Sequence, residues 1–186
     1  MIRFMRQFFS SHTILFVLAL STLSALAQQK SYSCRYFSIK YPQAWTTEVI
    51  GNPNSTSASL TEASINIKPI ASKFGEPKQN IAINMDPSID WSTFGQNELT
   101  QLKKTIKNQY QEVSFLTEPE FASYKGLNGV FMEYTAMIEG YQARMMQCII
   151  HKQNGFTYFI TICVDNNKAA RQLEEINGIM DTMMIK

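Results

Sequence analysis

Apolar and polar residues alternate most regularly between Gly129 and Asp165. This alternation predicts three β-strands, because successive side chains of a strand point to opposite faces. The pairs Glu139-Gly140 and Asn154-Gly155 separate the strands, and each places a glycine where a two-residue hairpin turn needs a positive φ. The residues between the turns are mainly β-branched, aromatic or methionine, which suits a pleated, half-buried surface. The segment therefore predicts a scaffold and specifies no chemistry.

Shorter alternating segments in the first half of the chain predict four more strands, at residues 36–41, 45–50, 63–68 and 80–85. Pro42 ends the first of them, since proline offers no N–H to a strand ladder. The polar residues 51–59 predict a loop, and a second loop contains Pro69, Gly75 and Pro77.

Helical spacing appears in two places. Residues 91–108 carry Leu99, Leu102 and Ile106 on one stripe, and Ser92 or Asp90 can cap the start of this helix. A short strand at 111–116 and a connection at 117–128 are expected between this helix and the three-stranded segment.

The last helix is expected to begin after a cap at Asn166 or Asn167 and to run to about Met184. Its apolar side should pack against Ile160 and Ile162. The apolar side comprises Leu173, Ile176, Met180 and Met183. Strands joined by hairpins, with helices between groups of strands, predict an α+β fold in which helices flank an antiparallel β-sheet.

The first 27 residues have the pattern of a cleavable signal peptide. Arg3 and Arg6 precede an apolar run at 13–20, and Ala25 and Ala27 are small residues at the positions that a signal peptidase reads. An uncleaved membrane anchor is the alternative, but the run is shorter than the ~20 residues of a spanning helix. No cysteine follows the run directly, so a lipid-modified N-terminus is not indicated. We expect an exported protein, periplasmic or secreted, with one domain at 28–186.

Charge narrows the choice of partners. The chain has 17 basic and 15 acidic residues, and the two arginines of the expected signal peptide leave 15 of each in residues 28–186. A formal charge of zero and the absence of a basic run argue against nucleic acid as a partner. No apolar segment after the signal peptide is long enough to cross a membrane.

The opening of the mature chain resembles a known superfamily. Residues 37–42 and Trp45 read F-S-I-K-Y-P-x-x-W, which matches the opening F-x-I-x-Y-P-x-x-W of the PsbP-like superfamily. The strand at 80–83, Gly129 and the segment 155–161 follow in the order typical of that group, and the match covers most of 36–184. The resemblance implies an α/β/α sandwich, a fold shared with a yeast Ran-binding nuclear-import factor, and action by binding rather than catalysis. Many members are exported bacterial proteins of unknown role, and no calcium or partner motif of particular members can be matched here.

Catalytic candidates are few. His151 is the one histidine after the signal peptide, so any nucleophile–base scheme must use it. A two-residue second turn places His151 opposite Tyr158 and on the other face from Cys148. Asp86 and Asp90 do not match a calcium loop and suit a turn followed by a helix cap. No metal or cofactor site is expected, and a hydrolase is a distant third hypothesis.

Glu133 lies within a predicted strand, diagonal to Arg144 on the same face. A cross-strand ion pair is the expected role of these two residues, because opposite charges on neighbouring strands attract weakly at such positions.

Three cysteines follow the signal peptide, and their odd number leaves at least one thiol unpaired in a monomer. With a two-residue second turn, Cys148 faces Thr161 and Met146 faces Cys163. Cys148 and Cys163 then share a face but lie diagonally, which is poor geometry for a bond. A bulge would bring them together, so a Cys148–Cys163 disulfide stays open, as does a bond from Cys34 to either. Otherwise all three are small buried apolar residues.

Two binding functions remain. The first is a non-catalytic exported domain that binds a protein or envelope partner through its loops, since binding residues concentrate on loops. The candidate loop residues are Asn54, Ser55, Lys73, Phe74, Glu118, Glu120 and Tyr124. The second is a carrier of a small apolar or lipid ligand between the three-stranded segment and the last helix. Methionines gather in this half of the chain, and flexible thioethers either line an adaptable pocket or fill a core.

Overall fold

The computed structural model describes residues 29–55, 63–71, 79–152 and 155–186. The strands in chain order are β1 (Gln29–Ser33), β2 (Phe37–Pro42), β3 (Trp45–Ile50), β4 (Ser64–Pro69), β5 (Asn80–Asp86), β6 (Gln111–Tyr124), β7 (Leu127–Ile138), β8 (Tyr141–Lys152), β9 (Phe156–Asp165) and β10 (Met184–Ile185). The helices are the 3₁₀ turns η2 (Trp91–Thr93) and η3 (Asn166–Lys168) and the α-helices α2 (Gln96–Gln109) and α3 (Ala169–Asp181).

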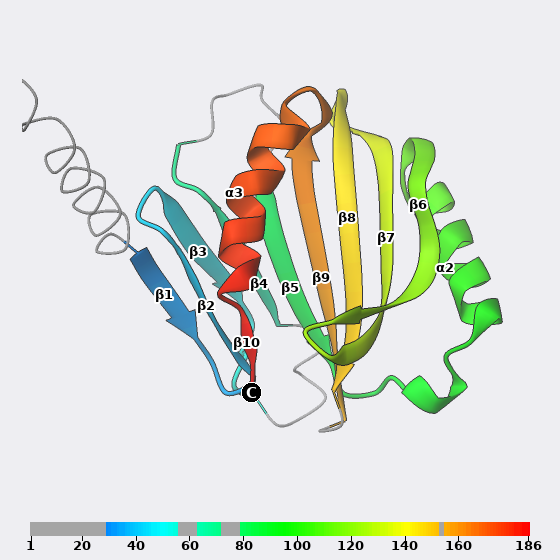
Figure 1. Cartoon of the computed structure of the whole chain (residues 1–186), viewed down its shortest axis with the longest axis horizontal. Helices are drawn as coiled ribbons and strands as arrows, with labels where there is room; N and C mark the ends of the chain where they lie inside the picture. The colour runs from blue at the N-terminus through cyan, green and yellow to red at the C-terminus, as the bar shows by residue number, and fades with distance from the viewer. Residues whose placement is uncertain (1–28, 56–62, 72–78, 153–154) are drawn as a thin grey trace, which may run out of the picture.

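Seven strands form the main sheet in the order β3-β4-β5-β9-β8-β7-β6, and β1-β2-β10 form a smaller sheet. All neighbouring strands in both sheets are antiparallel. Helix α3 and the smaller sheet cover one face of the main sheet, and α2 lies on the other face beside β6 (Figure 1). The architecture confirms the predicted α+β class, with an antiparallel sheet flanked by helices.

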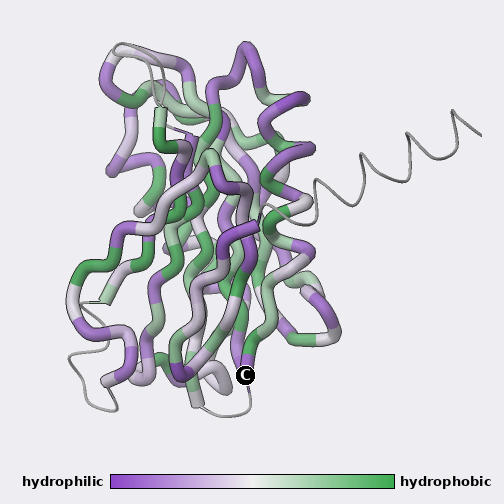
Figure 2. The backbone as a smooth tube through the Cα atoms, turned by 90° about the vertical axis from the view of Figure 1, so that its left-hand side faces the viewer, coloured by the Kyte–Doolittle hydropathy of each residue, from purple (hydrophilic) through white to green (hydrophobic). Residues whose placement is uncertain are grey.

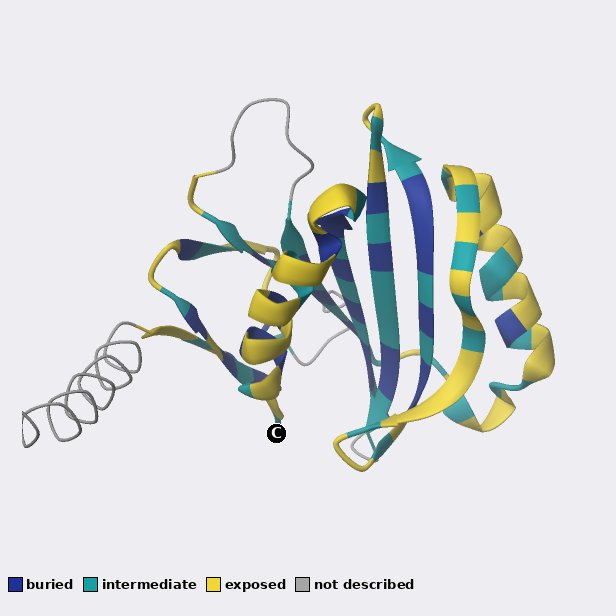
Figure 3. Cartoon of the chain, turned by 45° about the horizontal axis from the view of Figure 1, so that its top comes forward, coloured by how far each residue is buried: buried dark blue, intermediate teal, exposed yellow. Residues whose placement is uncertain are grey.

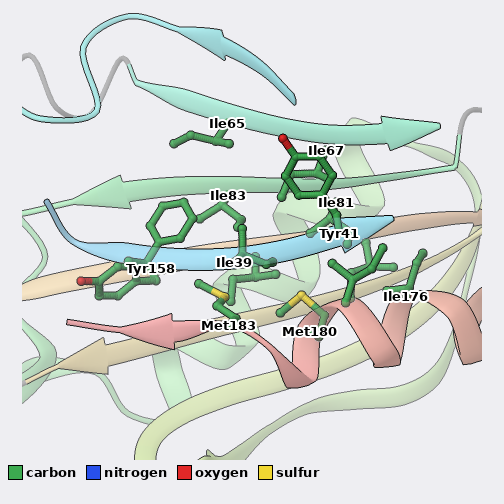
Figure 4. Packing of buried hydrophobic residues seen from close by; sticks show 14 of the residues in the cluster. Ile39, Tyr41, Ile65, Ile67, Ile81, Ile83, Tyr158, Ile176, Met180 and Met183 are labelled. Atoms are coloured by element: carbon green, nitrogen blue, oxygen red, sulfur yellow. The ribbon is translucent and has the colours of Figure 1, made fainter. Parts of the chain in front are cut away.

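The core between the main sheet, the smaller sheet and α3 is built mainly from isoleucines. Those of β4 and β5 meet Ile39 and Tyr41 of β2 and the apolar side of α3 (Figure 4). Ile160 and Ile162 belong to the same buried cluster as Ile176, which confirms the packing predicted for the last helix. The opening motif is therefore structural, because the side chains of its apolar residues are buried in this core.

A second core lies under α2. Leu99 and Ile106 of α2 are buried against β7 and β8, and Leu102 packs at the edge of the same cluster. Apolar and polar residues alternate along the strands (Figure 2), as a sheet covered on both faces at different places requires. The outer side of each helix and most of β6 are exposed (Figure 3).

Two predicted elements have different bounds. The connection expected at 117–128 is mostly strand, because β6 continues to Tyr124 through three register shifts. Pro119 fits there since β6 is an edge strand, where a missing N–H breaks no inner ladder. The last helix starts later than predicted, because the carboxylate of Asp165 accepts from the backbone N–H of Asn167 (2.9 Å) and caps η3 instead. It also ends at Asp181, and Met184 lies in β10.

The predicted register of the last hairpin is wrong by one residue. Lys152 pairs with Phe156, which leaves three residues rather than two between the paired positions. Cys148 therefore faces Ile160. The turn at Glu139-Gly140 has the predicted two residues, and both adopt a positive φ (51° and 85°).

The corrected register separates the two cysteines that could have formed a disulfide. Cys163 faces Met145, which is an odd number of residues from Cys148, so Cys148 and Cys163 lie on opposite faces of the sheet. Cys34, Cys148 and Cys163 are all free thiols in the described chain.

Candidate functional site

The end of β6, the turn after it and the start of β7 form a strap, defined here as residues 120–130, which bends over the face that carries α3. Figure 1 shows the strap crossing the ends of β8 and β9 toward the C-terminal end of α3. Lys125 and Gly126 form its turn, both with a positive φ (50° and 80°). Register shifts before Glu120 free this half of β6 from the straight course of the edge and allow the bend.

The strap is fastened to α3 by hydrogen bonds. The hydroxyl of Tyr124 donates to the carbonyl of Met180 (2.9 Å). The ammonium of Lys125 donates to the carbonyls of Met180 (3.2 Å), Asp181 (2.8 Å) and Met183 (2.9 Å). The last carbonyls of a helix have no partner within the helix and carry its partial negative charge, so a lysine there is favourable. The strap therefore caps α3 as well as covering the sheet.

Gly129 lets the strap rejoin the sheet closely. A Cβ atom built on Gly129 would lie 2.5 Å from the carbonyl oxygen of Ile149 on β8, well inside van der Waals contact. The close approach of β7 to β8 at this point therefore requires glycine.

A cleft of about 230 Å³ lies between the strap, the sheet and α3. Most of its lining is apolar, and it is lined among others by Tyr124, Phe131, Met146, Cys148, Ile162 and Met180. The floor comes from β8 and β9, one wall from the strap and the other from α3. This is the space between the three-stranded segment and the last helix in which an apolar ligand was expected.

The titratable groups of the cleft are neutral at physiological pH. Burial raises the pKa of the Cys148 thiol to about 11. Burial, followed by the nearby Cys148 and Asp181, raises the pKa of Tyr124 to about 12. A thiol with a raised pKa is a poor nucleophile, because the thiolate is the reactive form. The cleft is suited to hold an apolar group and not to attack one.

A second cavity, of about 320 Å³, lies on the other face of the sheet. It is lined by Tyr110, Tyr141 and Glu139, together with Met145 and Cys163. Its walls come from the end of α2 and from the hairpin between β7 and β8, so it is separated from the first cleft by the sheet itself.

The loop residues predicted as a binding surface do not form one. The side-chain oxygen of Asn54 accepts from the backbone N–H of Arg35 (2.8 Å), and the carbonyl of Ser55 accepts from the Tyr36 hydroxyl (2.6 Å). Both residues thus fasten the chain after β3 to the start of β2. Lys73 and Phe74 lie outside the described residues.

The remaining candidates lie on β6 rather than on a loop. Glu118 pairs with Lys103 of α2 (2.6 Å), and Glu120 faces Phe131 in the ladder. Tyr124 is the predicted site residue that lines the cleft. Sequence reasoning missed Lys125 and Gly129, although the Lys-Gly pair between two alternating runs is the signal of a tight turn.

His151 occupies a structural environment. Its ring stacks on Trp91, with centroids 5.5 Å apart and planes within 5° of parallel, and its Nδ1 lies 3.4 Å from the hydroxyl of Thr157. It therefore faces Thr157 and not Tyr158, and it lies on the opposite face from Cys148. Within the described chain His151 has no contact with a nucleophile that it could activate.

The acidic residues have the structural roles predicted for them. The carboxylate of Asp86 accepts from the backbone N–H and hydroxyl of Ser88 (2.7 and 2.6 Å), and Asp90 caps η2 through the N–H of Ser92 (2.9 Å). The hydroxyl and then the N–H of Ser92 hold the pKa of Asp90 below its usual value.

The predicted ion pair between strands is also present. Arg144 Nε donates to Glu133 Oε1 at 2.6 Å on the face that carries α3.

Two searches of the described residues returned nothing. No group of three or more His, Cys, Asp or Glu side chains in 29–55, 63–71, 79–152 and 155–186 is placed to hold a metal ion. No helix in the same residues combines the length and the hydropathy that a membrane crossing needs.

No family model matches the sequence, and no curated protein matches it. Three solved structures are similar in fold. Cyanobacterial PsbP (CyanoP) from Synechocystis has a TM-score of 0.60 and 11% identity, covering 86% of this chain and 94% of its own. LpqN of Mycobacterium tuberculosis, involved in cell envelope biogenesis, has a TM-score of 0.57 and 12% identity, covering 85% and 91%. A Pseudomonas aeruginosa protein of unknown function has a TM-score of 0.52 and 13% identity, covering 86% and 98%. Identities this low establish fold alone, and on that basis the chain has the PsbP-like fold.

Proposed function

We propose that this protein is an exported, non-catalytic binding domain of the cell envelope that holds a small apolar group in the cleft beneath the strap. The observation that carries the proposal is the cleft itself, with apolar walls from three separate elements and neutral titratable groups. An apolar space of this kind gains free energy when a ligand displaces water from it, at roughly 0.8 kcal/mol per buried methylene.

The size of the cleft limits the ligand. A volume of about 230 Å³ is below the roughly 300–1,000 Å³ of sites for drug-sized molecules. Since a water molecule occupies about 30 Å³ of liquid, the space equals roughly seven or eight waters. A short acyl chain, or the end of a longer one, matches this volume and the apolar lining.

Two further observations support an envelope role. The first 27 residues have the pattern of an export signal. One protein of the same fold, LpqN, is described as involved in cell envelope biogenesis.

The test uses the fluorescent apolar probe N-phenyl-1-naphthylamine and residues 28–186. Met146→Trp should fill the cleft and abolish the rise in probe fluorescence, because Met146 lines it. Met137→Trp is the matched control, since Met137 is a half-buried methionine of the neighbouring strand outside the cleft lining. Decanoate should displace the probe from the wild-type protein and from the control. Equal probe binding by Met146→Trp, or no binding by the wild type, would refute the proposal.

A protein partner is the second candidate, and exposed side chains on β6 favour it. Leu116 and Phe121 are 52% and 50% exposed, which is unusual for large apolar residues of a strand. Crosslinking in the native cell should join β6 to one envelope protein, and Leu116→Ser with Phe121→Ser should remove that product. A crosslinking pattern unchanged by the two substitutions would exclude this surface.

A further inference from the structure

Basic side chains gather around one end of the molecule, where α3 ends and β10 begins. Residues 180–186 form the centre of this end. Lys125 contacts three carbonyls of the segment, as described above, and the ammonium of Lys152 donates to the carbonyl of Ile185 (3.4 Å). Two separate strands, β6–β7 and β8, thus bring a lysine to the same short segment.

The smaller sheet adds three more basic residues to this end. The backbone N–H and carbonyl of Lys40 both bond the hydroxyl of Thr182 (2.8 and 3.0 Å), so Lys40 lies beside the end of α3. Lys186 reaches the carbonyl of Cys34 (2.6 Å), which places Arg35 next to the end of β10. We call the set Arg35, Lys40, Lys125, Lys152 and Lys186 the basic end.

Acidic residues do not balance the basic end. Asp181 and the terminal carboxylate are the negative groups of the segment 180–186. The ion pairs found in the described part of the chain include none of Arg35, Lys40, Lys125 and Lys152. Residues 28–186 have 15 basic and 15 acidic residues, so an excess of positive charge here means an excess of negative charge elsewhere. The protein is therefore electrically polarised although its formal charge is zero.

An exposed apolar side chain lies within the basic end. Met184 of β10 is 65% exposed, the highest value among the large apolar residues of the described chain. It is paired with Ser38 and is held in place by a regular strand ladder. Methionine is flexible enough to enter an irregular apolar environment.

We propose that the basic end docks on a lipid bilayer surface that contains anionic phospholipids, with Met184 entering the boundary between headgroups and acyl chains. Basic residues around an exposed apolar side chain are the features that bind proteins to anionic bilayers. The contacts lie around one end of the molecule and not in a groove, which suits a broad surface better than an acidic peptide. Met180, which lines the cleft, also contacts Lys125, so the docked protein holds the cleft close to the bilayer.

The experiment measures cosedimentation of residues 28–186 with vesicles of phosphatidylcholine alone or mixed with phosphatidylglycerol. Arg35→Glu with Lys40→Glu is the informative variant, because both residues are exposed and no hydrogen bond found in the described chain uses either side chain. Lys104→Glu with Lys107→Glu is the matched control, since it makes the same change in charge on exposed positions of α2.

The wild type and the control should bind mixed vesicles at low salt, with release at high salt, and should not bind phosphatidylcholine alone. The Arg35/Lys40 variant should bind at least tenfold more weakly, and Met184→Ser should weaken binding by a smaller factor. Equal losses in the variant and the control would overturn the proposal, as would absence of binding to mixed vesicles. Displacement by soluble polyglutamate at matched charge would also overturn it and would indicate an acidic protein.

This surface and the cleft are tested independently. Met146→Trp, which fills the cleft, should bind mixed vesicles as well as the wild type, because Met146 is not part of the basic end. Loss of vesicle binding in Met146→Trp would contradict a separate docking surface.

Discussion

Gly129→Ala tests whether the strap rejoins the sheet as closely as the structure indicates. The added Cβ would meet the carbonyl oxygen of Ile149 at 2.5 Å, and atoms at this position are essentially never closer than 3.0 Å. The backbone of β7 or β8 must therefore shift, which disturbs a ladder between two central strands. Overpacking of this kind typically costs about 1–3 kcal/mol. We expect this loss in the free energy of unfolding, measured by urea denaturation with an unchanged slope.

The matched control is Gly178→Ala in α3. A Cβ at Gly178 meets no atom within 4 Å, so the same chemical change adds no clash there. Alanine in a helix interior is favoured over glycine by roughly 0.5–1 kcal/mol, so this variant should be more stable than the wild type. The two glycines should thus respond with opposite signs. A Gly129→Ala protein within about 0.5 kcal/mol of the wild type would refute the close approach, because surface substitutions without a clash fall in that range.

Three further predictions follow from other contacts. Lys125→Met keeps the aliphatic stem but removes the bonds to the end of α3, and it should lower the free energy of unfolding by about 1–2 kcal/mol; no measurable loss would mean that the cap is not stabilising. Ile160→Ala should cost about 2–5 kcal/mol through lost burial and a cavity, and a loss under about 0.5 kcal/mol would mean that the face is wrongly assigned. Burial raises the pKa of Cys148 and Cys163 from 9.0 to about 11, so both thiols favour the folded state below pH 9 and lose that contribution as the pH rises toward 11. Urea denaturation across this pH range should show a smaller fall for Cys148→Ala with Cys163→Ala than for the wild type.

The main elements could be predicted from the sequence because their signals are local. The hairpin at Glu139-Gly140 has its turn residues and its flanking alternation within a few positions of each other, and its register is as predicted. The hairpin at 152–156 has similar residues, but a three-residue connection moved every later pair by one position. Turn length sets register, and a glycine alone does not specify the length.

The strap could not be predicted for a different reason. Pro119 and Gly126 are typical of a connection, and an edge strand can include both when its ladder is irregular. The cleft depends on contacts between Tyr124 and Met180, which are 56 positions apart, and no periodic pattern reports such a contact. The loop residues Asn54 and Ser55 were plausible binding residues by type, but their polar groups are used to fasten the chain after β3.

The most direct test of the cleft is a decanoate titration of residues 28–186 with isotopically labelled methionine methyl groups, followed by NMR. Met146 and Met180 line the cleft, whereas Met132 is fully buried in the core under α2 on the other face of the sheet. Binding in the cleft should shift the Met146 and Met180 signals together, with saturation, and leave Met132 unchanged. No saturable shift at Met146 and Met180, or a larger shift at Met132, would contradict a ligand site beneath the strap.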